Sequence, residues 1–137
     1  MEWFSVQLDT RSELMLYVLR DRAGATSSVF GSLIAPDGTV SNIGPGSVRA
    51  QATGRWLSPH TAATYPSGWQ LDLPDQQLVL LLTPQLEDQE LYFPDAVFAG
   101  PAYWEGAVDV YVNGALSPTG VGYVELTGYA QATASTQ

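Results

Sequence analysis

Residues 103–129 read Y-W-E-G-A-V-D-V-Y-V-N-G-A-L-S-P-T-G-V-G-Y-V-E-L-T-G-Y. Two runs that alternate in polarity flank Asn113-Gly114, and this pattern predicts a β-hairpin. Folding it about a centre near residue 116 places Ala107 opposite Glu125. A slip by one residue would mix the two faces, because side chains in a strand alternate with a period of two. The hairpin is therefore predicted to be a ribbon with two chemically different faces.

One face of this ribbon is acidic and aromatic, and the other is small and apolar. The first comprises Tyr103, Glu105, Asp109, Tyr111, Tyr123, Glu125, Thr127 and Tyr129. The second comprises Trp104, Gly106, Val108, Val110, Gly120, Gly122, Val124, Leu126 and Gly128. Carboxylates are rarely buried without a partner, which favours the first face as the solvated one. The opposite arrangement, with the acids facing inward, stays open from the sequence.

The rest of the chain consists of further short apolar or alternating runs separated by Gly- and Pro-containing turns. Strands are predicted at residues 3–8, 13–20, 29–35, 39–43, 47–52, 69–73, 77–83 and 90–93. Residues 56–66 contain two prolines, which exclude a central strand, and are predicted to be irregular. Residues 77–83 are apolar on both faces, so both faces are expected to be covered.

This order of elements predicts one all-β domain rather than several. Sequential neighbours throughout favour a single antiparallel up-and-down β-barrel, closed as a meander, over residues 1–130. Residues 131–137 are small and polar and are predicted to form a flexible tail. Within the barrel, residues 78–82 together with Phe4, Val6 and Trp69 are expected to line an apolar ligand cavity.

Composition narrows the classes of partner. The 137 residues include 14 acidic residues, five basic residues and no cysteine, for a net charge of −9. Such a charge argues against nucleic acid and against an anionic membrane surface. One histidine and no cysteine make a metal site improbable, and no cofactor is expected. No run is apolar enough for a membrane span, and the start lacks a signal peptide, so a cytoplasmic location is expected, or an extracytoplasmic one if the chain is a fragment.

Several short stretches, taken in order, resemble one known family. They are W-F-S-V-Q-L-D at Trp3, S-P-H and Y-P-S-G-W between Ser58 and Trp69, L-T-P-Q-L-E-D-Q-E-L from Leu82, Y-W-E-G at Tyr103, and G-Y-V-E-L-T-G-Y from Gly122. The chain is similar to the AttH-like and carotenoid 1,2-hydratase-like proteins. This resemblance implies a lipocalin-like barrel of the calycin type. Members typically carry two such barrels, and this chain resembles the C-terminal one, so a second barrel or a homodimer is the implied protein partner.

The resemblance also implies an apolar isoprenoid or polyketide-type ligand and cofactor-independent hydration of an alkene. That chemistry needs a protonated carboxylic acid and aromatic faces that stabilise a cation. The implied catalytic residues are Glu105, Glu125 and Tyr17. The expected ligand-binding residues are Trp3, Gln7, Trp69, Trp104, Tyr123 and Tyr129.

Three alternatives to a hydratase stay open. One is a pericyclase of a natural-product pathway, because fungal Diels–Alderases share this architecture. Another is a carrier of hydrophobic ligands without chemistry, and the third is a structural half of a two-barrel assembly. His60, the only histidine, has no carboxylate partner evident in the sequence and is predicted to pack within its loop.

Overall fold

The computed structural model describes residues 1–94 and 102–130. Alternating polarity in short runs produces strands almost throughout. In chain order the elements are β1 (Glu2–Leu8), β2 (Glu13–Arg20), β3 (Thr26–Ile34), β4 (Val40–Ile43), β5 (Arg49–Ala52), β6 (Arg55–Leu57), β7 (Thr64–Pro66), β8 (Trp69–Leu73), the 3-10 helix η1 (Pro74–Gln76), β9 (Leu78–Pro84), β10 (Glu90–Leu91), β11 (Tyr103–Val112) and β12 (Gly120–Leu126).

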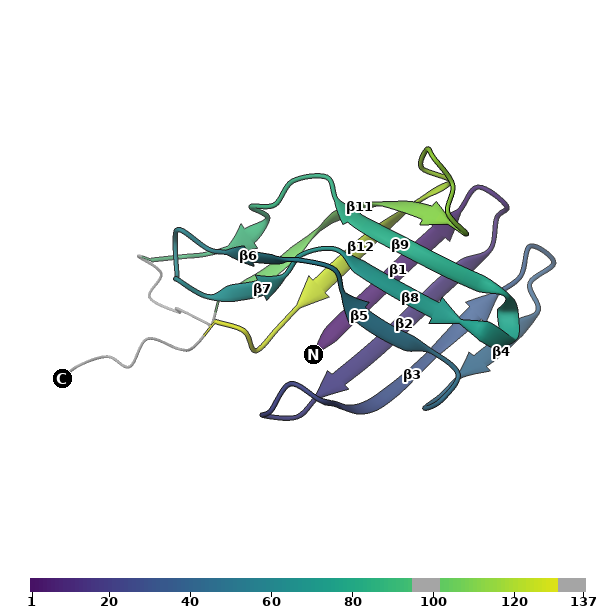
Figure 1. The fold of residues 1–137 in the computed structure, drawn as a ribbon, viewed down its shortest axis with the longest axis horizontal. Coiled ribbons are helices and arrows are strands. Elements are labelled where there is room, and N and C mark those ends of the chain that lie inside the picture. Colours follow the sequence, from purple (N-terminus) through teal and green to yellow (C-terminus); the bar gives the residue numbers. More distant parts are fainter. Residues whose placement is uncertain (95–101, 131–137) are drawn as a thin grey trace.

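The main sheet is antiparallel and curls on itself. Its hydrogen-bonded order is β4-β3-β2-β1-β12-β11-β9-β8-β5, with β10 added on β11. Figure 1 shows β8 and β9 crossing in front of β1 and β2, which gives the flattened shape of a half-barrel. The all-β, antiparallel barrel predicted from the sequence is thus confirmed. Within the described residues the hydrogen-bonded path starts at β4 and ends at β5, so the expected closure by strand pairing is not made and a seam separates β3 from β5.

The space between the two crossing layers is filled by apolar side chains. Phe4 on β1 contacts Trp69 on β8 edge-to-face, with ring centroids 5.8 Å apart. Trp69 in turn packs against Trp104 on β11 at 5.9 Å. Leu16, Leu80 and Val124 are fully buried around them. Leu80, Leu82, Phe4, Val6 and Trp69 therefore contribute to a packed core, not to the ligand cavity expected from the sequence.

The hairpin of β11 and β12 forms as predicted, but its register differs by two residues. Glu105 lies opposite Glu125, and Ala107 lies opposite Tyr123. Asn113 and Gly114 have φ angles of 50° and 77°, and the Ala115 amide donates to the Val112 carbonyl at 3.0 Å. These are the features of a tight turn of type I′. The Asn113-Gly114 turn lies before the middle of the loop between β11 and β12, so the strands pair about an earlier centre than predicted. Because side chains alternate with a period of two, a register shift of two residues keeps each side chain on its predicted face.

The two faces of the hairpin are now assigned. Trp104, Val108, Val110, Val124 and Leu126 are buried in the core. The acidic and aromatic residues within β11 and β12 point out of the barrel, whereas Tyr129, which follows β12, turns toward the buried Glu2. Gly122 suits the inner face because a Cβ there would lie 2.9 Å from the Ser5 carbonyl oxygen and 3.0 Å from Val108. Close contact between the strands therefore favours the glycine-rich side as the core.

Two predictions about the middle of the chain are wrong. The run at β9 is covered on one side only: Leu80 and Leu82 are fully buried, but Val79 and Leu81 are 42% and 39% exposed. Residues 56–66 are not wholly irregular, because β6 and β7 pair as a separate two-stranded sheet. The prolines keep this segment out of the main sheet, as expected, but its ends still pair. The predicted tail, residues 131–137, lies outside the described residues.

Candidate functional site

The residues that the sequence nominated for catalysis lie in one row on the outer face. Glu105 on β11 is directly opposite Glu125 on β12, and both are half-buried. Glu125 is opposite Trp3 on β1, which is opposite Tyr17 on β2. The rings of Trp3 and Tyr17 are 6.4 Å apart, and Tyr17 stacks on the exposed Phe30 at 4.9 Å. The structure thus brings the nominated acids and aromatics together, on the outside of the barrel.

Besides Trp3, two more predicted ligand-binding residues share this outer face. Tyr123 is 41% exposed, and its pKa is raised by partial burial and by the nearby Glu105 carboxylate. Gln7 is exposed on β1, next to Glu13 of β2. Neither pocket described below includes these residues. Glu105 and Glu125 carry like charges at directly opposed strand positions. Such a pair destabilises the pairing of the two strands.

Trp69 and Trp104 occupy the core between the layers. Trp69 is fully buried and Trp104 is 2% exposed. The Trp104 indole donates to the Glu87 carbonyl at 2.7 Å. The indole nitrogen of Trp69 is buried and has no hydrogen-bond partner within the described residues. Both side chains support the barrel instead of facing an open space.

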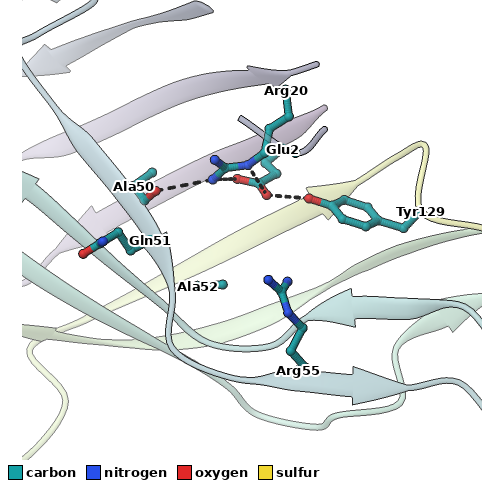
Figure 2. Close-up of a pocket in the computed structure, with 8 residues that line it drawn as sticks. Glu2, Arg20, Ala50, Gln51, Ala52, Arg55 and Tyr129 are labelled. Atoms are coloured by element: carbon teal, nitrogen blue, oxygen red, sulfur yellow. Dashed lines mark hydrogen bonds and ion pairs between the residues drawn. The ribbon is translucent and has the colours of Figure 1, made fainter. Parts of the chain in front are cut away.

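A pocket of about 450 Å³ opens at the end of the barrel where β1 begins. We call it the mouth pocket. It is lined by Glu2, Arg20, Gly24, Ala50, Gln51, Ala52, Arg55 and Tyr129 (Figure 2). These residues come from β1, from the end of β2, from the β2–β3 turn, from β5 and β6, and from the chain after β12. Its size lies in the range typical of small-molecule sites.

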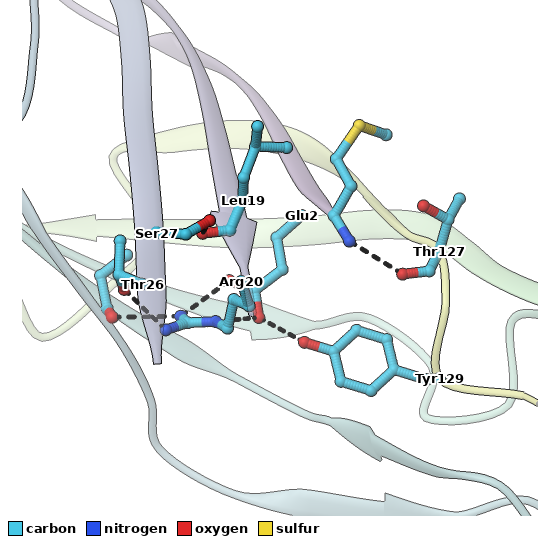
Figure 3. A network of polar contacts seen from close by, with 9 residues as sticks. Glu2, Leu19, Arg20, Thr26, Ser27, Thr127 and Tyr129 are labelled. Carbon is cyan, nitrogen blue, oxygen red and sulfur yellow. Dashed lines mark hydrogen bonds and ion pairs between the residues drawn. The ribbon is translucent and has the colours of Figure 1, made fainter. Parts of the chain in front are cut away.

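The charged floor of the mouth pocket is a buried ion pair. Glu2 is 1% exposed because it continues the inward alternation of Phe4 and Val6 on β1. Arg20 Nε donates to Glu2 Oε1 at 3.0 Å and Nη2 donates to Glu2 Oε2 at 2.9 Å (Figure 3). The same guanidinium donates to Thr26 Oγ1 at 2.9 Å and to the Ala50 carbonyl at 3.3 Å. The hydrogen bond to Glu2 is the main cause of a raised Arg20 pKa. Arg20 therefore neutralises Glu2 and ties β2 to β5 across the seam.

Tyr129 completes this network from the other side. Gly128 has a φ of 87°, and this left-handed turn follows directly after β12. The Tyr129 hydroxyl donates to Glu2 Oε1 at 2.6 Å. Burial, and then the hydrogen bond to Glu2, raise the pKa of Tyr129 above its usual range. Tyr129 was predicted to bind ligand, and the structure places it in the wall of the mouth pocket.

Alkaline pH is expected to destabilise the fold through this phenol. Because the pKa of Tyr129 is raised in the folded state, its contribution is fully present below the unfolded value and is lost as pH rises above about 10. Tyr129→Phe should therefore show a shallower loss of stability in that window. Urea unfolding of both proteins at pH 8, as the reference, and at several pH values above about 10 measures how steeply each free energy of unfolding falls with pH. Equal slopes would show that Tyr129 contributes nothing to this pH dependence.

A second carboxylate lies beside the mouth pocket. The Tyr65 ring packs on Tyr129 at 5.8 Å, and on its other side stacks with Trp56 at 6.1 Å. The Tyr65 hydroxyl and Glu90 Oε1 are both buried and have no hydrogen-bond partner within the described residues. Burial, followed by the charge of Glu90, raises the pKa of Tyr65. Glu90 Oε2 accepts a hydrogen bond from Thr61 at 3.2 Å.

His60 has a carboxylate partner after all. Its Nε2 lies 2.7 Å from Asp88 Oδ2, and its ring stacks on Tyr92 at 5.8 Å. The partner is 28 residues away in sequence, which is why local inspection did not reveal it. This contact links the β6–β7 turn to the loop before β10. It agrees with a packing role. Elsewhere in the described chain, no three His, Cys, Asp or Glu side chains gather as a metal site would require.

A second pocket, the seam groove, continues from the mouth pocket. Its volume is about 390 Å³, and Ala50 lines both. β3 pairs with β4 only from Gly31 to Ile34, so the earlier part of β3 faces β5 across this groove. Val29, Pro45 and Val48 make its apolar wall. Sequence reasoning missed the whole region because it forms between edges that are far apart in the chain.

A family model described as AttH-like matches residues 1–129. The chain belongs to the AttH-like family. The crystal structure of a protein from Nitrosomonas europaea described as an AttH has 32% identity and a TM-score of 0.82, and the match covers 95% of this chain and 38% of that one. No curated protein matches the chain.

Kievitone hydratase from Nectria haematococca is a more distant structural neighbour, with 20% identity and a TM-score of 0.66. That match covers 93% of this chain and 39% of the hydratase, and at this identity it shows the fold alone. The AttH-like chain thus spans less than half the length of both solved structures. The lipocalin-like fold is shown by these neighbours. Among the described residues, no helix has the length and apolar character that crossing a membrane requires.

Proposed function

We propose that this AttH-like barrel binds an apolar isoprenoid or polyketide-type small molecule in its mouth pocket and takes part in cofactor-independent hydration of an alkene. The observation that carries the proposal is the buried Glu2–Arg20–Tyr129 network on the floor of a pocket of about 450 Å³. Buried polar groups that converge on a cavity are typical of ligand sites. The chain belongs to the AttH-like family, and a hydratase is among its own structural neighbours. Both observations support hydration as the class of reaction.

Hydration adds a proton to one alkene carbon and a water oxygen to the other, and the attacking water loses a proton. Glu2 is paired with Arg20, so at the start of the reaction its carboxylate accepts hydrogen bonds. Tyr129 donates to Glu2 and can accept a hydrogen bond from water on its own oxygen. In our proposal the proton of the attacking water passes to Tyr129 while the Tyr129 proton passes to Glu2. After product release Glu2 gives this proton up to solvent, and the acid that protonated the alkene takes one up.

The alkene proton must come from a second group. Glu90 is the best-placed carboxyl, because it adjoins Tyr65, whose ring packs on Tyr129. Its Oε1 is buried and has no hydrogen-bond partner within the described chain. The rings of Tyr65 and Trp56 present aromatic faces beside it, and such faces stabilise a cation by about 0.5–2 kcal/mol each. A cyclisation without proton transfer would not need Glu90.

The outer row is a second candidate for the acid chemistry. It brings Glu105 and Glu125 together beside Trp3 and Tyr17, the set that the family resemblance implies. This face is open in the described chain, so chemistry there needs a cover. A second barrel, from the same longer protein or from a homodimer, would supply it. The neighbours' greater length supports such a partner.

Geraniol hydration tests the assignment. The wild-type chain is expected to add one water to geraniol. Mass spectrometry detects the product by the added mass of one water, and by the further increase when the reaction is run in isotopically labelled water. Tyr129→Phe and Glu90→Gln should each lower the rate by about 100-fold, the size usual for lost acid–base catalysis. Glu13→Gln, at an exposed position at the start of β2, is the matched control and should behave as wild type.

The variants Glu105→Gln and Glu125→Gln separate the two sites. Normal hydration by both variants supports the mouth pocket. If they abolish hydration while Glu90→Gln does not, the outer row is the reacting face. If the chain binds geraniol but no variant alters its turnover, the hydratase proposal fails and simple binding remains.

A further inference from the structure

We infer that the mouth pocket and the seam groove together bind an amphipathic molecule with a carboxylate head group, with Arg55 as its anchor and the seam as the channel for its apolar tail. This inference rests on the proposed function only in taking the mouth pocket as the binding site. It adds the charge of the ligand and its orientation. A purely apolar ligand would need neither feature.

The mouth pocket carries an excess of positive charge in a strongly acidic protein. The chain has five basic residues and a net charge of −9, yet two of its arginines line this one pocket. Arg20 is already matched by Glu2. Arg55 makes no ion pair or side-chain hydrogen bond with any other residue that the structure describes. The pocket side chains therefore hold one positive charge more than they balance.

The orientation of Arg55 fits an anchoring role. Arg55 begins β6, and Figure 2 shows its guanidinium pointing from that strand toward the Glu2–Arg20 pair and Tyr129. A guanidinium recognises a carboxylate with two parallel hydrogen bonds. Because Arg20 is fixed by four contacts, it stays in place and keeps the Glu2 charge from repelling an incoming anion. Arg55 is then free to take the ligand's head group.

The seam groove supplies the apolar half of the site. It shares Ala50 with the mouth pocket, so the two cavities adjoin along β5. Val29 and Val48 are apolar, and Ser28 and Gly46 are small, which leaves room for an alkyl chain. Arg49 also borders the groove, but it lies 3.6 Å from Asp72 and is paired. Among the described residues, the cation without a partner is thus at one end and the apolar surface at the other, which sets a direction for the ligand.

Three probes test this inference: decanoate below its critical micelle concentration, 1-decanol below its solubility limit, and acetate. Binding is followed by tryptophan fluorescence, since the half-buried Trp56 follows Arg55 on β6. Decanoate is expected to bind about tenfold more tightly than 1-decanol, and a tenfold ratio corresponds to about 1.4 kcal/mol. Acetate, which lacks the tail, should bind far more weakly than either. Arg55→Gln should remove the preference for decanoate while 1-decanol binding is unchanged.

Arg11→Gln is the matched control. It removes the same charge from the β1–β2 turn, at the other end of the barrel, and should keep the decanoate preference. Equal binding of decanoate and 1-decanol would overturn the inference and leave the proposed function standing. So would an unchanged preference in Arg55→Gln. If neither amphiphile binds, the inference fails, and geraniol hydration then decides the proposed function separately.

Discussion

Trp69→Ala is expected to lower the free energy of unfolding by about 4 kcal/mol, within the range for loss of a large buried aromatic side chain. Trp69 is fully buried at the start of β8, between Phe4 and Trp104. It joins the two crossing layers, so its loss leaves a cavity where few backbone shifts can close it. Urea unfolding monitored by circular dichroism measures the change in free energy of unfolding. Tryptophan fluorescence is less suitable, because the substitution removes one of the tryptophans that give the signal.

Leu81→Ala is the control for this prediction. Leu81 lies on the neighbouring strand β9 but faces outward and is 39% exposed, so a loss below about 1 kcal/mol is expected. Trp69→Phe is a sharper comparison. It keeps a ring in the core and removes an indole N–H that has no partner in the described chain, so it should be far milder than Trp69→Ala. Equal losses in all three variants would contradict this account of the core.

Glu2→Gln is expected to lower the free energy of unfolding by about 3 kcal/mol. Removing one member of a buried ion pair leaves the other charge uncompensated, which costs about 3–5 kcal/mol. The lower end applies because the Arg20 side chain is 21% exposed and keeps some contact with water. The phenol of Tyr129 also loses its charged acceptor. Urea unfolding at pH 7 measures the loss.

Two further variants test the physical cause. Glu13→Gln removes an exposed carboxylate from β2 and should change stability by less than about 0.5 kcal/mol. The double variant Glu2→Leu with Arg20→Met removes both charges, so no unpaired guanidinium remains, and it should be more stable than Glu2→Gln alone. If the double variant is less stable, the cost arises from lost packing or hydrogen bonds and not from an unpaired charge.

The hairpin illustrates how far local patterns reach. Alternation over residues 103–129 was enough to predict two strands, a turn at Asn113-Gly114 and the division of side chains into two faces. The register was wrong by two residues because the tight turn lies off-centre, and the remaining loop residues up to Thr119 extend the returning side. Periodicity specifies which residues share a face, but the position of a turn within a loop depends on backbone geometry.

The candidate site was predicted only in part, and for an identifiable reason. Tyr129, nominated as a ligand-binding residue, lies in the wall of the mouth pocket, and the outer row of Glu105, Glu125, Trp3 and Tyr17 does come together. Glu2 was missed, although its spacing of two from Phe4 places it on the inward face of β1. The alternation along β1 therefore indicates that Glu2 is buried. It does not indicate the ion-pair partner of Glu2, because Arg20 is 18 residues away.

Strand period, turn residues and the ordered motifs were sufficient for the all-β class, the antiparallel pairing and the family, because each depends on neighbours along the chain. The direction of the acidic face, the exposure of the outer side of β9 and the pairing of His60 with Asp88 were decided only by the folded chain. So were the mouth pocket and the seam groove, which form where β1, β2, β5 and β6 meet. Burial and charge pairing depend on which segments meet in space, and a chain read residue by residue does not contain those distances.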